Sequence, residues 1–137
     1  MKHEVIILDT NIWISFLLSR KYHILVDTIL SNHLEIVTCN TLIDEFNEVL
    51  QRAKFKRYLK MNDIREAVKI HLRLCRLVEV EMKVDYLIDK KDNFLIDLYM
   101  ASKATMLVTG DKQILEQAPK FGFNAITLKQ FEDHNFH

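Results

Sequence analysis

The sequence predicts an α/β fold with a mostly parallel sheet. Short apolar runs recur along the chain, and amphipathic segments of helical length separate them. Strands that alternate with helices in this way form parallel sheets, because each intervening helix crosses one face of the sheet. The chain has 137 residues, of which 49% are hydrophobic and 28% charged, so we expect one domain over residues 1–137.

The N-terminal third predicts two strands and two helices. Residues 5–8 are wholly apolar and mostly β-branched, which is typical of a central strand covered on both faces. Residues 12–18 and 22–31 carry apolar side chains at helical spacing, so each segment predicts a helix. Residues 35–38 form another short apolar run and predict the second strand.

The middle of the chain predicts two longer helices. The first runs over residues 40–52 and begins at Asn40 or Thr41, both of which are capping residue types. The second runs over residues 62–74 and begins at an Asn–Asp pair. His71 and Cys75 stand four residues apart, a spacing that can bind zinc. No second pair accompanies them, so we expect both to face the core.

Strands and helices continue to alternate in the C-terminal half. Residues 78–82 alternate between apolar and charged, which predicts an edge strand that is wet on one face. A charged loop over residues 84–91 leads to a helix over residues 92–103, and the apolar run 106–109 predicts a central strand. We also expect a short helix to about residue 117, a strand over residues 124–127 and a flexible tail over residues 133–137.

Scarce residue types exclude several classes of protein. With two glycines, at positions 110 and 122, the chain cannot form a dinucleotide-binding loop or a P-loop. The two cysteines form no C-x-x-C motif, and the longest apolar run, residues 12–18, is too short to cross a membrane. We therefore expect an intracellular, cytoplasmic protein without a membrane segment. Nineteen basic residues balance nineteen acidic ones, so a nucleic-acid partner requires a local basic patch.

Acidic residues follow the ends of the predicted strands. Asp9 comes directly after the first strand, and Asp111 lies two residues after the fourth. Glu45 is in the second turn of the helix that follows the second strand. Asp92 opens the helix before the fourth strand, and Asp97 lies about one and a half turns later. Ligands of open parallel sheets bind at the carboxyl ends of the strands. If the first and fourth strands are neighbours, at least three of these acids share one rim.

Such a cluster of carboxylates predicts a metal site. Crowded carboxylates repel one another, and Mg²⁺ or Mn²⁺ removes the conflict because hard cations prefer oxygen ligands. The metal would orient a phosphodiester and activate a bound water. Taken singly, the acids have simpler roles: Asp9 and Asp92 suit helix caps, Glu45 suits a solvated helix face, and Asp111 suits a turn. Two observations favour a metal site over these simpler roles: the acids lie at the same end of their strands, and the sequence has no rival cluster of acids.

Four short motifs stand in order along the chain. They are VIILDTN at residues 5–11, LIDEF at 42–46, DNFLIDL at 92–98 and LVTGD at 107–111. In this order and spacing they resemble the four acidic motifs of the PIN domain family, the metal-dependent ribonuclease fold of many toxins of toxin–antitoxin systems. The resemblance covers nearly the whole chain.

The resemblance implies a three-layer α/β/α sandwich with a five-stranded parallel sheet in the order 3-2-1-4-5. The strand predicted at the edge of the sheet is the third, and the apolar first and fourth strands are central, which agrees with this order. The resemblance also implies that four acids are catalytic and hold Mg²⁺ or Mn²⁺: Asp9, Glu45, Asp92 and Asp111.

The third acidic position is the least fixed by the resemblance. We prefer Asp92, with Asp97 as the second choice. Some family members place this acid one position later, where this chain has Asn93. Asn11 and Thr109 are expected to fix the carboxylates by hydrogen bonds.

A basic stretch in the middle of the chain is a candidate RNA-binding surface. Lys54, Lys56 and Arg57 carry charges that suit RNA phosphates. A solvated basic face is the commoner role of such a stretch.

We therefore expect a Mg²⁺- or Mn²⁺-dependent endoribonuclease that hydrolyses RNA phosphodiester bonds. The resemblance implies products with a 5′-phosphate and a 3′-hydroxyl, a protein antitoxin as partner and a homodimer. A non-catalytic RNA- or protein-binding module of the same fold is the first alternative. A phosphatase that forms an aspartyl-phosphate at Asp9 is the second, although Asn11 stands where such enzymes have another acid.

Overall fold

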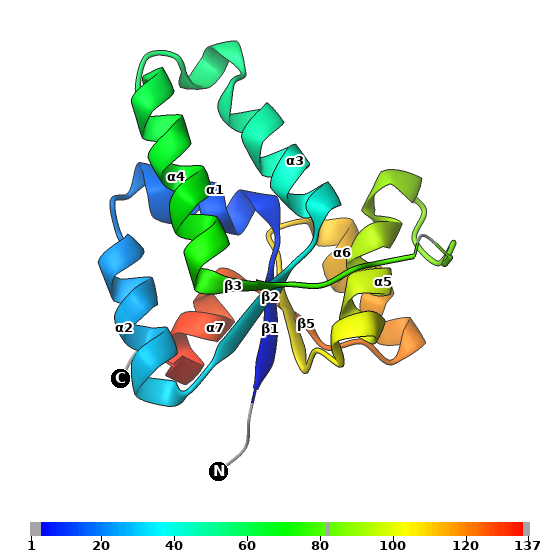
Figure 1. Ribbon diagram of the computed structural model, residues 1–137. Helices are drawn as coiled ribbons and strands as arrows, with labels where there is room; N and C mark the ends of the chain where they lie inside the picture. Colours follow the sequence, from blue (N-terminus) through cyan, green and yellow to red (C-terminus); the bar gives the residue numbers. More distant parts are fainter. Residues whose placement is uncertain (1–3, 82, 136–137) are drawn as a thin grey trace.

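The computed structural model describes residues 4–81 and 83–135 (Figure 1). Five parallel strands form one sheet in the order β3-β2-β1-β4-β5, so the predicted fold class and strand order are confirmed. β1 lies in the middle, paired with β2 on one side and β4 on the other. The strands are β1 Val5–Leu8, β2 Glu35–Thr38, β3 Cys75–Leu77, β4 Met106–Val108 and β5 Ala125–Ile126.

Helices cover both faces of the sheet and give the three layers (Figure 1). Ile6 and Leu8 of β1 face one core, and Val5 and Ile7 face the other, because successive side chains of a strand point to opposite faces. The first core packs against α1 Thr10–Leu18, α2 Tyr22–Asn32, α3 Asn40–Leu50, α4 Met61–Leu74 and α7 Leu128–Asn135. The second packs against α5 Asn93–Ser102 and α6 Lys112–Gln117. Among the described residues, no helix has the length and apolar character that a membrane span requires.

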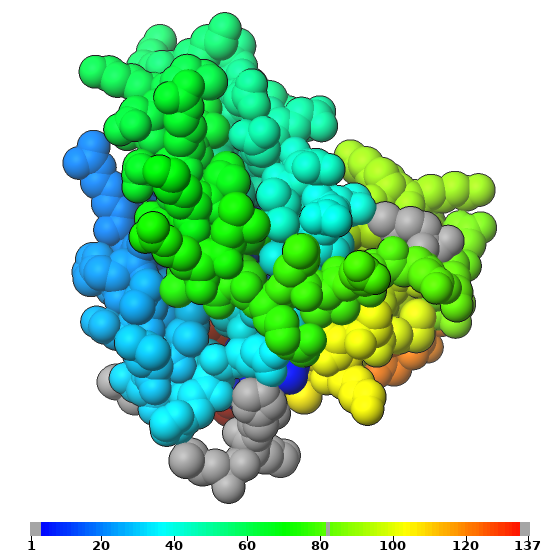
Figure 2. All heavy atoms as spheres, viewed as in Figure 1, coloured from blue at the N-terminus to red at the C-terminus, as the bar shows by residue number. Residues whose placement is uncertain are grey.

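The third strand begins earlier in the chain than predicted. β3 follows α4 directly and pairs with β2 from Cys75 to Leu77, whereas the alternating pattern predicted a strand over residues 78–82. The ladder closes with the bond from the Val78 N–H to the Thr38 carbonyl, at 2.8 Å, because β2 ends there. Residues 79–81 then continue outside the sheet, and residue 82 lies outside the described residues. The edge position is confirmed, and Figure 2 shows this green segment crossing the surface.

Two helix starts differ from the predicted caps. Cys39, and neither Asn40 nor Thr41, occupies the cap position of α3, and it makes no side-chain capping bond. α4 begins one residue before the predicted Asn–Asp pair, at Met61. There the Asp63 carboxylate accepts the Lys60 N–H at 2.8 Å, so this acid still closes the first turn.

The C-terminal helix α7 was not predicted. Thr127 and Gln130 cap it reciprocally: the Thr127 hydroxyl accepts the Gln130 N–H at 3.1 Å, and the Gln130 side chain accepts the Thr127 N–H at 2.9 Å. Phe131 of this helix is fully buried in the first core. Residues 133–135, expected in a flexible tail, belong to α7, and residues 136–137 lie outside the described residues.

His71 faces the core, as predicted. It is fully buried against the rings of Trp13 and Phe46, with ring centroids at 4.2 and 5.3 Å. Its Nε2 lies 2.8 Å from the Thr38 hydroxyl. Cys75, the other member of the pair, is half-buried in β3 and forms no disulfide.

Candidate active site

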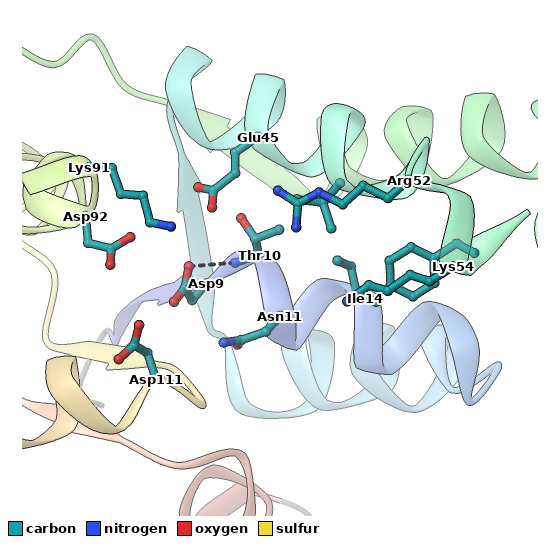
Figure 3. A pocket seen from close by; sticks show the side chains of 12 residues that line it. Asp9, Thr10, Asn11, Ile14, Glu45, Arg52, Lys54, Lys91, Asp92 and Asp111 are labelled. Atoms are coloured by element: carbon teal, nitrogen blue, oxygen red, sulfur yellow. Dashed lines mark hydrogen bonds between the residues drawn. The ribbon is translucent and has the colours of Figure 1, made fainter. Parts of the chain in front are cut away.

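A pocket of about 320 Å³ lies at the carboxyl ends of β1 and β4, where the strand order reverses (Figure 3). Open parallel sheets bind ligands at this position, because loops from neighbouring strands diverge there and leave a crevice. Each of the four predicted acids lines the pocket from a different element. Asp9 follows β1, Glu45 lies on α3, Asp92 ends the 3₁₀ helix η2 (Lys90–Asp92), and Asp111 precedes α6.

Asp9 is held rigidly at the end of β1. Its backbone N–H donates to the Val108 carbonyl at 2.9 Å, so the residue prolongs the pairing of β1 with β4. Its Oδ1 accepts the Thr10 N–H at 2.8 Å, and this bond caps α1. Burial raises the pKa of the Asp9 carboxyl, and nearby Asp111 raises it further, while the bonds from Thr109 and Thr10 act in the opposite direction. Asp9 therefore has a structural role and a place in the pocket at once.

The loop after β4 is tied to the segment after β1. The buried Thr109 hydroxyl donates to Asp9 Oδ2 at 2.7 Å and accepts the Asp111 N–H at 3.1 Å. The Asn11 side chain accepts the Gly110 N–H at 3.2 Å. Asp111 in turn caps α6, because its Oδ1 accepts the N–H groups of two residues in the first turn. Thr109 and Asn11 thus make the bonds that a role in fixing the carboxylates requires.

Glu45 and Asp92 face the same pocket from its other side (Figure 3). Asp92 is buried, and burial raises the pKa of its carboxyl to about 7, with further contributions from Asp9 and other nearby acids. Burial and the neighbouring Asp9 also raise the pKa of Glu45. The Thr10 hydroxyl, Lys91 and Arg52 act in the opposite direction on Glu45. Although Asp92 stands at the cap position of α5, its side chain makes no capping bond, so it is free to face the pocket.

Three basic residues share the pocket with the acids: Arg52, Lys54 and Lys91. Sequence reasoning selected Lys54 and missed the other two. Figure 3 shows the Lys91 ammonium among the carboxylates and Lys54 at the opposite end of the pocket. Lys56 and Arg57, the other predicted RNA contacts, do not line this pocket, because the chain turns away after η1 (Ala53–Phe55).

Asp97 and Asn93 hold the loop before α5. Asp97 Oδ2 accepts the N–H groups of Lys83 and Val84 at 3.1 and 3.4 Å, and it does not line the pocket. Asn93 Oδ1 accepts the N–H groups of Tyr86 and Leu87 at 3.1 and 2.8 Å. Both side chains therefore anchor backbone, and of the three candidates for the third acidic position, Asp92 is the one in the pocket.

The donor set of the pocket fits a hard divalent cation. Four carboxylates supply oxygen ligands, which Mg²⁺ and Mn²⁺ prefer, and neighbouring acids raise the pKa values of Asp9, Glu45 and Asp92, so the pocket favours positive charge. In the part of the chain that the structure describes, no three acidic, imidazole or thiol groups already form a metal-ligand cluster.

Comparisons with known proteins identify a matching family and a solved structure with a similar fold. The family model described as "PIN domain" matches residues 5–113. Among solved structures, the fold is similar to a chain in the crystal structure of VapBC2 from Rickettsia felis bound to a DNA fragment from their promoter. The TM-score is 0.62 at 12% sequence identity, over 90% of this chain and 98% of that chain. A search of curated proteins found no significant match.

Proposed function

The chain belongs to the PIN domain family, and from this premise we propose that it is a divalent-metal-dependent endoribonuclease that hydrolyses RNA phosphodiester bonds. The observation that carries the proposal is the convergence of acids from four separate elements on one pocket at the switch point of the sheet. Helix caps or solvated acids would not need to share a pocket, whereas metal ligands must.

The proposal gives each acid the role of a metal ligand. Asp9, Glu45, Asp92 and Asp111 would hold Mg²⁺ or Mn²⁺, which orients a phosphodiester and lowers the pKa of a bound water. The carboxylate of Asp9 has a defined position in this set, because hydrogen bonds from Thr10 and Thr109 hold both of its oxygens. Burial and neighbouring acids raise the pKa values of Glu45 and Asp92, and a bound cation would oppose this shift because it favours the charged carboxylates.

We further propose that the chain is the toxin of a toxin–antitoxin pair, with a protein antitoxin as its partner and a homodimer as its assembly. The family match and the similarity to the VapBC2 structure support this role. Co-purification of the chain with the product of a neighbouring gene, and loss of its RNA cleavage in that complex, would test it.

A cleavage assay on structured RNA tests the proposed activity. The purified protein is incubated with RNA in Mn²⁺, in Mg²⁺ and in EDTA, and the product ends are identified. We expect cleavage with either metal, none in EDTA, and products with a 5′-phosphate and a 3′-hydroxyl. RNA binding without cleavage in any metal would instead support the non-catalytic module. Release of inorganic phosphate from a phosphomonoester would support the phosphatase.

A further inference from the structure

The pocket extends beyond the carboxylates into a part with different chemistry. Figure 3 shows Arg52, Lys54 and Ile14 on the side away from Asp92 and Asp111. We call this part the cationic subsite, and it consists of Ile14, Val49, Arg52, Lys54 and Phe55. It combines two positive charges with apolar side chains, directly beside the cluster of acids.

The fold fixes the position of Arg52. It lies just after the end of α3, and its side chain lines the same pocket as that of Glu45. The Arg52 N–H donates to the Val49 carbonyl at 3.1 Å, and the Arg52 carbonyl accepts the Phe55 N–H at 3.0 Å. These two bonds hold the turn that follows the helix, so the guanidinium begins from a defined backbone position.

The charges of the subsite are available to a ligand. Lys54 Nζ lies 5.1 Å from the centroid of the Phe55 ring, which is itself buried in the first core. Among the described residues, no carboxylate lies within ion-pair distance of Arg52 or Lys54. Arg52 acts on Glu45 only from beyond ion-pair distance, so both cations face the pocket without forming an ion pair among the described residues.

We propose that the cationic subsite binds the nucleotide next to the bond that is cleaved, with Arg52 as the positioning residue for its phosphate. This inference rests on the proposed nuclease function. An acidic cluster by itself repels an RNA strand, and a cation beside it offsets that repulsion. The guanidinium presents paired donors that match two phosphate oxygens, while Ile14 and Val49 offer an apolar wall to the sugar and base.

The size of the pocket agrees with one nucleotide at a time. Its volume of about 320 Å³ is at the lower end of the range of ligand pockets, which suits one nucleotide of an extended single strand. Single-stranded segments are also where proteins bind RNA bases and backbone together.

Arg52→Gln and Arg73→Gln form a matched pair that tests the subsite. Both remove one charge, but Arg73 is exposed on α4 and does not line the pocket. The affinity for a short single-stranded RNA is measured in EDTA at several salt concentrations, and KM and kcat are measured with Mn²⁺. We expect Arg52→Gln to weaken RNA binding by about tenfold and to reduce the salt slope by about 0.7. It should raise KM more than it lowers kcat, and Arg73→Gln should change neither.

Arg52→Lys serves as the conservative variant. It keeps the charge but lacks the paired donors, so its KM should fall between those of wild type and Arg52→Gln. Equal effects of Arg52→Gln and Arg73→Gln, or no effect of either, would overturn the subsite whether or not the protein cleaves RNA. If wild type does not cleave but Arg52→Gln alone loses RNA affinity, the subsite stands and the proposed nuclease activity is wrong.

Discussion

The Thr109 hydroxyl donates a hydrogen bond of 2.7 Å to Asp9 Oδ2 and joins the ends of the two central strands. The same hydroxyl oxygen accepts the Asp111 N–H at 3.1 Å. One buried side chain thus holds two acids, Asp9 and Asp111, that follow different strands of the sheet. The rigidity of the site at the switch point depends on this hydroxyl.

Thr109→Val tests this dependence, because valine has nearly the same shape but lacks the hydroxyl. The bond from Thr109 lowers the pKa of Asp9, so its loss should raise that pKa and shift metal binding and cleavage to higher pH. The free energy of unfolding should fall by about 1–3 kcal/mol, because a buried carboxylate loses its donor. The measurement is the pH profile of cleavage together with urea unfolding.

Thr105→Val is the matched control for this variant. The Thr105 hydroxyl bonds the Val5 backbone at the opposite end of β4. Its loss should cost stability but leave the pH profile of cleavage unchanged. Identical pH profiles for Thr109→Val and wild type would mean that Thr109 does not tune Asp9.

Metal binding near pH 6 should release protons. The pKa of Asp92 is raised from 3.8 to about 7, so near pH 6 the metal-free protein holds a proton that a cation must displace. Between these two values the folded state binds more protons than the unfolded state, so this group makes the metal-free protein less stable as pH rises. Calorimetry of Mn²⁺ binding in buffers of different ionisation enthalpy measures the release, and Asp92→Asn should reduce it. Equal proton release by wild type and Asp92→Asn would show that another group titrates.

Asp97→Ala and Asp92→Ala should have opposite effects. Asp97 accepts the N–H groups of Lys83 and Val84, so its loss should cost about 1–3 kcal/mol of stability and leave Mn²⁺ affinity intact. Asp92 makes no capping bond and is crowded by other acids, so its loss should weaken Mn²⁺ binding and leave stability unchanged or raised. Melting temperatures and Mn²⁺ titrations separate the two. A greater loss of Mn²⁺ affinity in Asp97→Ala would reverse the assignment.

His71 should make the protein sensitive to acid. Burial lowers its pKa from 6.5 to about 4, so in this range the unfolded state binds more protons and stability falls as pH falls. In His71→Gln this part of the pH dependence should disappear, although the variant is less stable at pH 7. Urea unfolding at pH 7 and pH 5 measures it, with His23→Gln, at an exposed position on α2, as the control. An unchanged loss of stability between these pH values in His71→Gln would refute the prediction.

The acidic cluster could be predicted from the sequence, because the carboxyl ends of parallel strands share one edge of the sheet. Asp9 and Asp111 follow β1 and β4 closely, so the strand order alone brings them together. The choice between Asp92 and Asp97 could not be made in the same way. It depends on which side chain the loop before α5 uses as an acceptor, and that loop has no repeating pattern.

Other features were predicted wrongly or missed because their positions depend on interactions that a sequence pattern does not contain. The alternation after Leu77 predicted a strand, but the length of β2 decides where pairing ends. Arg52 lies past the end of α3, so helical spacing does not place it, and its position in the pocket depends on the turn that follows the helix. The pair Thr127 and Gln130 matches a helix-capping pattern, and this pattern could have predicted α7.

The most direct test of the proposed metal-dependent cleavage compares wild type with Asp9→Asn. Asparagine keeps an oxygen for the Thr10 N–H that caps α1, but it removes one negative charge from the pocket. We expect the variant to fold with a melting temperature close to that of wild type, because relief of repulsion offsets the weakened bond to Thr109. It should lose most of its Mn²⁺ affinity and nearly all Mn²⁺-dependent RNA cleavage. Full Mn²⁺-dependent cleavage by Asp9→Asn would contradict the proposed mechanism.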